Sequence, residues 1–436
     1  MSNDTTRTTP RTRRAAALSV AAAAALLAVT ACSGGSDAAE DGDVTLRFTW
    51  WGAEHRNAVT EEVIARYEEQ NPGVTIDAEN SPWEGYWDRL ATQSAGDDAP
   101  DVIQMDASYL SEYSERGALL DMDQVDVSSF DDNAVQNGTT DDGLVGVTTG
   151  INTMTVLANP ELFEQAGMEM PDDESWTWDD YLELTSELRE ELPEEVYGDG
   201  SVPQTADLQI WLRQQGKHLA DGDGELGHSV ADLEEYFEYQ QDLLEADSYP
   251  SATVMQEVSG MAPGESPFET GDQAVGRWWS NQVPALSEQA AVDFEPLRYP
   301  SQSGSSEDNG LWFKSTMMYS VSAGTEHPEE AQEFVDFLVN DEEAAEIIGM
   351  DRGLPASEGA REVVLDQIDG QEQVVADFID EVSDEIGEAE PVPPVGFSQL
   401  QDIAYRYCNE VFFGRLTPAE AAEQMHAEMQ EALEQG

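Results

Sequence analysis

Several large aromatic side chains stand beside residues that can hydrogen-bond through planar polar groups. The pairs are Trp51 with Glu54, Trp83 with Asn80 and Glu84, Tyr109 with Asp106, and Trp279 with Asn281 and Gln282. An aromatic ring can lie flat against an apolar face of a ligand, while a neighbouring carboxylate or amide bonds to polar groups at the ligand's edge. We therefore predict a binding site built from these residues, with Trp312, Arg352 and Phe397 as further candidates.

Several of these candidates also have a purely structural explanation. Trp83 could cover an apolar patch, Glu54 could serve only the start of a helix, and Arg352 could pair with a neighbouring acid. Trp211 stands at helical spacing with Leu208 and Leu212. That spacing predicts a core position for Trp211.

The elements that must position the first candidates follow from hydrophobic periodicity. Strands are predicted at residues 44–50, 74–78 and 101–106, separated by helices at 54–70 and 86–95. This alternation predicts a parallel sheet that is covered by helices and linked by right-handed crossovers. Ligands of such sheets meet the carboxyl ends of the strands, and Asp106 stands at one of these ends.

The first predicted strand ends in two adjacent tryptophans. Because side chains alternate along a strand, Trp50 and Trp51 are predicted to point to opposite faces. We expect Trp50 to enter the core and Trp51 to face the crevice, with Gly52 leaving the space beside it open. Alternatively, both rings pack against the sheet.

The rest of the chain is rich in helix signals. A helix is predicted to begin after Thr177, with Asp180 completing an acidic capping box, and Pro328 and Pro418 each mark another helix start. The chain has 436 residues, of which 40% are apolar. It can therefore bury a sizeable core and is predicted to divide into two domains.

The composition is strongly acidic. Asp and Glu number 91 against 19 Lys and Arg, which gives a formal charge of −72. Such a charge repels nucleic acid. The acids are spread over nearly every segment, which favours a halophilic surface adapted to concentrated salt over a dedicated cation site.

The N-terminus has the features of a secretory signal peptide, predicted at residues 1–31. Arginines precede the apolar run AAALSVAAAAALLAVTA, which ends before Cys32. The run LAVTAC resembles a bacterial lipobox, which implies cleavage before Cys32 and a diacylglyceryl lipid, such as one carrying palmitate, on its thiol. Residues 32–43 are predicted to form a flexible tether. No later segment has the apolar length of a membrane span, so the mature chain is expected outside the cytoplasm.

No cofactor or metal is expected. The histidines show no metal-ligand spacing, and DGDGE at 221–225 lacks the remaining ligands of a calcium loop. Besides Cys32 the only cysteine is Cys408, so no intrachain disulfide is expected. Cys408 is predicted to be a small buried apolar residue, because no basic cluster surrounds it.

From about Val44 to its C-terminus, the sequence resembles the family 1 extracellular solute-binding proteins of ABC importers, in the group that serves sugars and oligosaccharides. The resemblance rests on the lipobox and on the order of WWG, YWDRLATQSAGDDAPDVIQMDASYLSEYSERGALLDM, GVTTGINT, FETGDQAVGRWWSNQV, PEEAQEFVDFLVNDEEAAEIIG and GLPAS. Two features depart from the family pattern. The helices are acidic where the family is rich in lysine, and VLANPEL replaces a tyrosine-asparagine-lysine turn.

The resemblance implies a two-lobed α/β fold of the type II periplasmic-binding kind, with the ligand cleft between the lobes. The first lobe would comprise residues 44–149 and 297–345, and the second residues 150–296 and 346–436. GVTTG and EPLRYPS would be hinge segments that let the lobes swing.

The resemblance also implies a function. The chain would be a monomeric, non-enzymatic receptor, held on the outer face of the cell membrane by its lipid, that passes a sugar or oligosaccharide to an ABC transporter permease. A sugar suits the predicted site because it has apolar C–H faces and a rim of hydroxyls. Of the adjacent Trp278 and Trp279, Trp279 is the predicted ligand contact because WSNQ matches the family.

Two alternatives remain open at this stage. A secreted glycoside hydrolase would also display aromatic rings and paired carboxylates. A receptor of the same fold could instead bind a peptide, a polyamine or a metal.

Overall fold

The computed structural model describes residues 43–83, 85–222, 224–259, 261 and 265–435. The predicted signal peptide, Cys32 and the tether up to Gly42 lie outside the described residues. None of the helices in these ranges has the length and apolarity of a membrane span.

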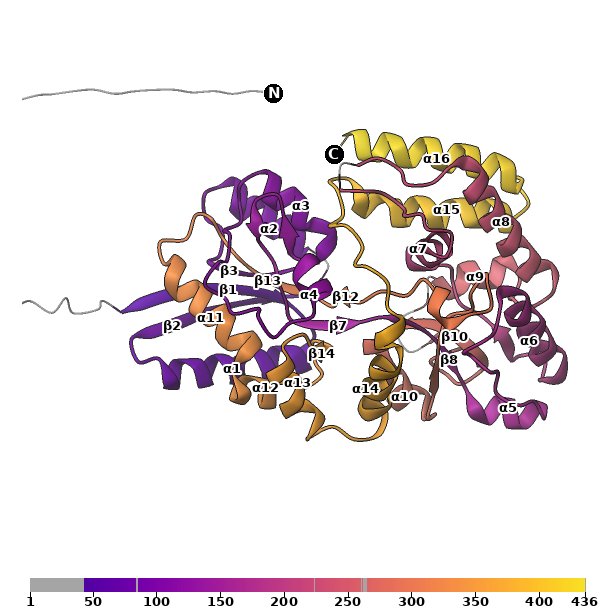
Figure 1. Ribbon diagram of the computed structural model, residues 1–436, viewed down its shortest axis with the longest axis horizontal. Coiled ribbons are helices and arrows are strands. Elements are labelled where there is room, and N and C mark those ends of the chain that lie inside the picture. The colour runs from indigo at the N-terminus through magenta and orange to yellow at the C-terminus, as the bar shows by residue number, and fades with distance from the viewer. Residues whose placement is uncertain (1–42, 84, 223, 260, 262–264, 436) are drawn as a thin grey trace, which may run out of the picture. The chain divides into compact units, whose positions relative to one another are not determined.

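The first sheet has five strands in the order β2-β1-β3-β13-β6 (Figure 1). They are β1 (Val44–Trp51), β2 (Val74–Ser81), β3 (Val102–Met105), β6 (Val147–Thr148) and β13 (Met318–Val321). β1 is parallel to both β2 and β3, which confirms the predicted parallel arrangement. β13 is antiparallel to its neighbours and comes from a distant part of the sequence.

Helices cover both faces of the first sheet (Figure 1). They are α1 (Glu54–Gln70), α2 (Tyr86–Ala95), α3 (Ala107–Glu115), α4 (Asp132–Gln136), α11 (Pro328–Asn340), α12 (Glu342–Ile348) and α13 (Glu358–Leu365). The predicted bounds of α1 and α2 are confirmed. A small hairpin, β4 (Thr139–Thr140) and β5 (Gly143–Leu144), follows α4.

The second sheet has four strands in the order β11-β8-β10-β9. They are β8 (Met154–Ala158), β9 (Tyr197–Asp199), β10 (Gln273–Trp279) and β11 (Glu295–Leu297). Its helices are α5 (Pro160–Ala166), α6 (Trp178–Glu191), α7 (Thr205–Arg213), α8 (Val230–Glu245), α9 (Ala252–Ser259), α10 (Val283–Ala290), α14 (Gly370–Val382), α15 (Leu400–Phe412) and α16 (Pro418–Gln435). Four short 3-10 turns lie at Ser280–Gln282, Ser306–Asp308, Ser383–Glu385 and Phe397–Gln399.

The helix starts follow local chemistry. Thr177 caps α6 and its hydroxyl accepts from the Asp180 amide, while the Asp180 carboxylate accepts from Thr177, so the predicted capping box is confirmed. Pro328 and Pro418 open α11 and α16, as predicted.

A third, three-stranded sheet lies between the two larger sheets (Figure 1). Its central strand is β7 (Gly150–Asn152), which pairs antiparallel with β12 (Lys314–Ser315) and with β14 (Leu354–Pro355). The predicted hinge GVTTG runs into β7, and the other predicted hinge, EPLRYPS, begins with β11 of the second sheet. Movement at these segments stays a prediction.

Helix packing places the later segments of the chain. α12 packs against α1, α11 and α13, on the side of the first sheet, whereas α14 packs against α10 and β11. Leu297, Tyr299 and Leu311 belong to the hydrophobic core around the second sheet. The chain therefore passes between the two cores several times, and the predicted lobe bounds stay a prediction.

The core of the second sheet contains a buried ionic cluster. The Arg277 guanidinium lies 3.5 Å from an Asp199 carboxylate oxygen and 3.3 Å from an Asp207 oxygen. Tyr181 donates a hydrogen bond to Asp199, and Tyr299 donates one to Asp207. Burial raises the pKa of the Asp207 carboxyl, and the Arg277 charge acts in the opposite direction.

Two further predictions concern the core. Cys408 is buried, as predicted, and burial raises the pKa of its thiol to about 12, so the thiol stays protonated at neutral pH. Trp211 packs against the core around the second sheet, and its ring centroid lies 5.8 Å from that of Trp178 and 5.2 Å from that of Tyr239.

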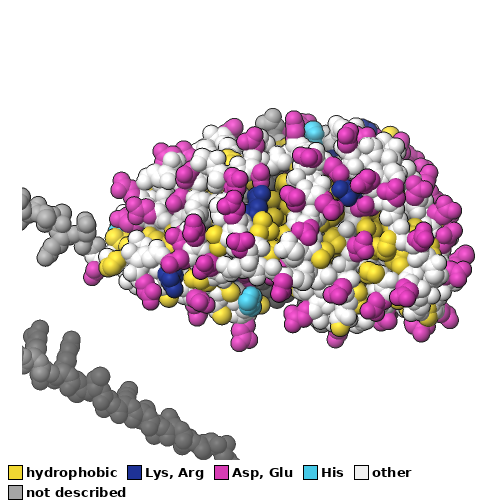
Figure 2. Space-filling model, turned by 60° about the horizontal axis from the view of Figure 1, so that its bottom comes forward, with side chains coloured by type: hydrophobic (Ala, Val, Ile, Leu, Met, Phe, Trp, Pro, Cys, Tyr) yellow, Lys and Arg dark blue, Asp and Glu magenta, His cyan; other side chains and the backbone are white. Residues whose placement is uncertain are grey.

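Apart from a few buried acids such as Asp199 and Asp207, the acidic side chains lie outside these cores. Figure 2 shows Asp and Glu spread over the face drawn there, with hydrophobic side chains between them. Most arginines pair with surface or half-buried acids, as Arg406 does with Glu428 and Arg415 with Glu410. Such exposed pairs each contribute little to stability.

The first stability prediction concerns Arg277. Arg277→Met leaves Asp199 and Asp207 buried without their cation, and we expect the free energy of unfolding to fall by about 3–5 kcal/mol. Arg415→Met, which removes an exposed ion pair, should cost less than about 1 kcal/mol. Urea unfolding at pH 7.5 measures both, and an equal effect of the two variants would contradict the role of the buried cluster.

The second stability prediction concerns His228, which lies before α8 and faces His426 of α16, with ring centroids 5.3 Å apart. Burial, together with the nearby His426, lowers the pKa of His228 from 6.5 to about 4. The unfolded chain therefore binds a proton at a higher pH than the folded chain does. The contribution of His228 to stability is complete above pH 6.5 and is lost as the pH falls toward 4.

When the pH is lowered from 7.5 to 5.0, protonation of His228 in the unfolded chain should lower the wild type's free energy of unfolding by about 2 kcal/mol. His228→Gln removes the titrating ring, so its loss over the same interval should be smaller by that amount. Urea unfolding at the two pH values measures the difference. Parallel losses in both proteins would show that His228 does not titrate with a lowered pKa.

Candidate functional site

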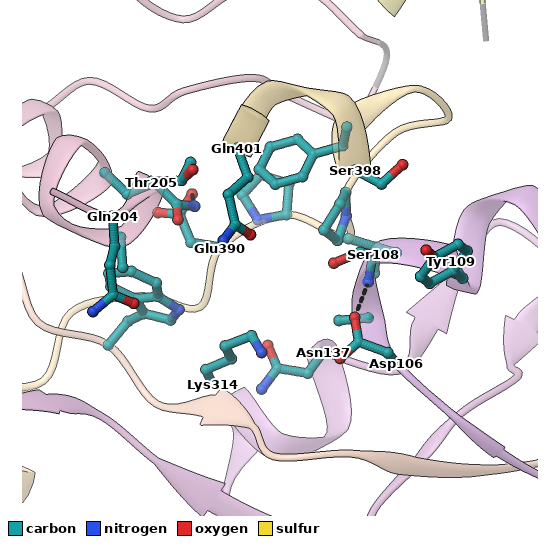
Figure 3. A pocket seen from close by; sticks show the side chains of 18 of the residues that line it. Asp106, Ser108, Tyr109, Asn137, Gln204, Thr205, Lys314, Glu390, Ser398 and Gln401 are labelled. Atoms are coloured by element: carbon teal, nitrogen blue, oxygen red, sulfur yellow. Dashed lines mark hydrogen bonds between the residues drawn. The ribbon is translucent and has the colours of Figure 1, made fainter. Parts of the chain in front are cut away.

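A cavity of about 320 Å³ lies between elements of the first and second sheets. From the first sheet's side it is lined by Trp83, Asp106, Ser108, Tyr109 and Asn137. From the other side it is lined by Gln204, Thr205 and Gln209 of α7, by Trp279, by Trp312 and by Lys314. Figure 3 shows that the labelled residues surround one space and come from several different elements.

Trp83 provides an exposed ring on the first side. It follows β2, and 46% of its surface is accessible although it is a large apolar residue. Its ring meets the edges of Trp51 and Trp87, with centroids 5.0 Å and 5.5 Å away. Trp87 stacks in turn on Tyr109 at 3.7 Å. The exposed ring therefore stands on a packed aromatic base that restricts its motion.

Asp106 and Tyr109 lie where the parallel sheet ends. Asp106 directly follows β3 and caps α3, and its carboxylate accepts a hydrogen bond of 2.9 Å from the Ser108 amide (Figure 3). Burial, together with the Asp106 charge, raises the pKa of the Tyr109 phenol. The Tyr109 hydroxyl therefore remains protonated at neutral pH and can donate a hydrogen bond.

Two tryptophans form the opposite side. Trp279 ends β10 and meets Trp312 edge to face, with centroids 5.9 Å apart and an interplanar angle of 89°. The Arg213 guanidinium lies 5.2 Å from the Trp312 ring, and the Lys314 amine lies 5.3 Å from the Trp279 ring. Both rings are thus held in place by neighbours.

A strap, defined as residues 386–399, closes one side of the cavity. It connects α14 to α15, and Glu390, Pro391, Val392, Pro393, Phe397 and Ser398 line the cavity. Glu390 pairs with Arg213 of α7, while Ser111 of α3 donates to the Pro393 carbonyl. Asn133 of α4 donates to the Gly387 carbonyl. The strap therefore bonds to elements of both sheets.

A second cavity of about 650 Å³ adjoins the first. Gln204, Trp279 and Gln401 line both cavities. The second cavity is otherwise bounded by residues that include Arg277, Trp278, Gln282 and Tyr405. Together the two cavities can hold a longer ligand than the first cavity can hold alone, and Trp279 lines both of them.

Six of the predicted ligand-binding residues line the first cavity: Trp83, Asp106, Tyr109, Trp279, Trp312 and Phe397. They come from five separate stretches of the chain, and the fold brings them together. Their contact with a ligand stays a prediction.

The other four predicted residues lie elsewhere. Trp51 is 9% exposed and lies behind Trp83, so it supports the cavity wall without lining it, while Trp50 is fully buried on the opposite face of β1. Glu54 is exposed at the start of α1. Asn281 accepts a hydrogen bond from the Asn152 side chain. Arg352 is buried, pairs with Asp351 and donates to Thr60.

Sequence reasoning missed several lining residues, chiefly Asn137, Gln204, Gln209, Lys314, Glu390 and Gln401. Lys314 carried a signal, because the chain has only two lysines. The others carried none, since amides and acids are common throughout the sequence. In the described part of the chain, no group of His, Cys, Asp and Glu is arranged to hold a metal ion.

Comparison with known proteins gives this geometry a context. Residues 52–345 match the family described as bacterial extracellular solute-binding protein. A lipoprotein of Streptomyces antibioticus is 23% identical over 327 residues, covering 71% of this chain and 69% of that protein. A lactose-binding protein of Rhizobium radiobacter is 24% identical over 271 residues, covering 58% and 61% of the two chains.

Solved structures show the same fold. A family 1 extracellular solute-binding protein of Alicyclobacillus acidocaldarius has a TM-score of 0.73 at 25% identity, covering 90% of this chain and 99% of its own. An oligogalacturonide-binding protein of Yersinia enterocolitica, solved with saturated digalacturonic acid, has a TM-score of 0.77 at 24% identity with the same coverage. These neighbours have the type II periplasmic-binding fold, which confirms the predicted fold class. The chain belongs to the bacterial extracellular solute-binding protein family.

Proposed function

We propose that this protein captures a sugar or oligosaccharide outside the cell and delivers it to the permease of an ABC transporter. The observation that carries the proposal is the placement of aromatic rings on both sides of one cavity, with hydrogen-bonding groups around them. Trp83 stands on one side, and Trp279 and Trp312 stand on the other.

This arrangement suits the chemistry of a pyranose. The faces of the ring present C–H groups, which pack against indole surfaces, and its rim presents hydroxyls that both donate and accept. Asp106, Gln204 and Gln209 offer carboxylate and amide groups in the same cavity. A cavity of about 320 Å³ lies within the usual range of about 300–1,000 Å³ for ligand sites.

The adjoining second cavity supports an oligosaccharide over a single sugar. Trp279 lines both spaces and could contact successive rings of one chain. Two of the similar proteins are described as binding lactose and oligogalacturonide, which supports a saccharide ligand here.

We also propose that the protein works as a monomer on the outer face of the cell membrane. The basic and apolar N-terminal segment, the lipobox before Cys32 and a similar protein described as a lipoprotein support this placement. A lipid on Cys32 would hold the receptor near its permease, and the acidic surface would keep it soluble in concentrated salt.

The binding prediction concerns the two sides of the cavity. A panel of oligosaccharides is first screened by thermal shift, because a ligand that binds only the folded state raises the melting temperature. Trp83→Ala and Trp279→Ala should each weaken the best ligand roughly 10-fold or more in calorimetry, since each removes one stacking surface. Trp211→Phe, which changes a ring packed in the second core, should leave the affinity within about 2-fold.

Binding of a peptide or a polyamine, with no response to any saccharide, would contradict the proposed ligand class. Release of hydrolysed product during the titration would instead support the glycoside hydrolase that the sequence left open.

The anchoring prediction concerns Cys32. In a bacterial host that processes lipoproteins, mass spectrometry of the membrane fraction should find the mature chain beginning at a diacylglyceryl-modified Cys32. Cys32→Ala should abolish the diacylglyceryl modification in the same measurement, because alanine has no thiol to carry the lipid. An unmodified Cys32 in the membrane fraction would refute the lipid anchor.

A further inference from the structure

The cavity contains a lysine whose charge is not matched within the protein. Lys314 lies on β12 and lines the first cavity, where its amine faces the Trp279 ring at 5.3 Å. Within the part of the chain that the structure describes, the amine has no hydrogen-bond or ion-pair partner. Figure 3 shows Lys314 and Asn137 extending into the same part of the cavity.

This is unusual in a chain where acids outnumber basic residues 91 to 19. The other described Lys and Arg side chains that form no ion pair are Arg89 and Arg189, and both donate hydrogen bonds, Arg89 to Thr49 and Arg189 to backbone carbonyls. The second lysine, Lys217, pairs with Asp232. Among the Lys and Arg side chains that the structure describes, Lys314 is thus the one whose donors remain unused, and it lies in the candidate site.

The acids that share the cavity already have partners. Asp106 accepts from the Ser108 amide, and Glu390 pairs with Arg213 of α7. Neither acid lies within ion-pair distance of the Lys314 amine in the described structure. The amino end of α7, at Gln204 and Thr205, also lines this cavity, and its partial positive charge adds to that of Lys314.

A ligand that fills the cavity removes water from the Lys314 amine. Burying an ammonium group is costly unless a hydrogen-bonded anion compensates its charge. A neutral hydroxyl compensates less than a carboxylate does, because hydrogen bonds between two charged groups are stronger. The ring of Trp279 supplies only part of the compensation.

We infer that the ligand is an acidic saccharide, in which a carboxylate on a sugar ring pairs with Lys314 while the rings stack on the cavity's tryptophans. The inference rests on the proposed saccharide-binding function and adds the charge class of the sugar. The overall negative charge of the protein opposes the approach of such a ligand, and concentrated salt screens that repulsion.

The test compares sugars that differ only in charge. One pair is α-1,4-linked digalacturonic acid and α-1,4-linked digalactose, in which a hydroxymethyl group replaces each carboxylate. Equivalent pairs of the gluco and manno series are measured beside it, by calorimetry in 0.15 M KCl.

The protein is the mature chain and three variants. Lys314→Met keeps the apolar stem, Lys314→Arg keeps the charge, and Lys217→Met removes the other lysine charge away from this cavity.

In at least one pair the acid should bind wild type 10-fold or more tightly than its neutral partner. Lys314→Met should weaken the acid roughly 10- to 100-fold, the range of a charge-assisted hydrogen bond, and the neutral sugar by less than 3-fold. Lys314→Arg should retain most of the preference for the acid, and Lys217→Met should leave it unchanged. In 2 M KCl the preference should persist, because salt screens an ion pair from which water is excluded much less than it screens exposed charges.

Two results overturn the inference but leave the proposed function in place. In one, neutral sugars bind as tightly as their acids and depend on Trp279. In the other, Lys314→Met weakens both members of a pair equally, as a purely structural role of Lys314 would require. If no saccharide of either charge binds, the proposed function fails and the inference fails with it.

Discussion

The arrangement of the site depends on the small sheet β12-β7-β14, where three separate segments of the chain meet between the two larger sheets. Backbone hydrogen bonds hold these segments side by side, so the ends of both larger sheets face one space. The packing is close at Gly150, where a Cβ atom would lie 2.3 Å from the Arg352 carbonyl oxygen. A side chain would force the strands apart at this point. Glycine is thus required here by contact with the neighbouring segment at Arg352 and Leu354, within the GVTTG stretch that the sequence predicts to be a hinge.

The same sheet brings Lys314 into the site, since β12 carries it beside β7 with its amine facing the Trp279 ring. The two sides of the cavity are built differently. On the first side, Trp83 is exposed on top of a group of aromatic rings that contains Trp51 and Trp87. On the second side, basic side chains lie against the rings of Trp279 and Trp312. Both constructions hold flat surfaces in fixed orientations, which lowers the entropy lost when a ligand binds.

The few basic side chains and the many acidic side chains lie in different parts of the structure. The few arginines serve structural purposes, as Arg277 does between two buried aspartates and Arg213 does between α7 and the strap. The many acids remain on the surface, where water and salt screen them. An unpaired lysine in a cavity is unusual in so acidic a chain, because most of the other basic side chains have a carboxylate partner.

Local sequence determined the elements and much of their orientation. The periods of β1, α1, β2 and α2 are set by neighbouring residues, so the bounds of α1 and α2, the first residues of β1 and β2, and the opposite directions of Trp50 and Trp51 could be predicted. β2 extends three residues beyond its predicted end, to Ser81. Asp106 directly follows β3, and the rule that ligands bind at the carboxyl ends of parallel strands made it a candidate. The capping box at Thr177 is likewise a contact between residues three positions apart.

Tertiary structure alone decided which residues share the cavity. Arg352 and Lys314 were both rare basic residues beside flexible or aromatic segments, yet Arg352 is buried against Asp351 and Lys314 faces the open space. Trp51 points to the predicted face, but the loop after β2 places Trp83 over it. The strap reaches the site from beyond residue 385 through contacts with Ser111, Asn133 and Arg213. Contacts between segments so far apart depend on the packing of whole elements, and no local periodicity encodes them.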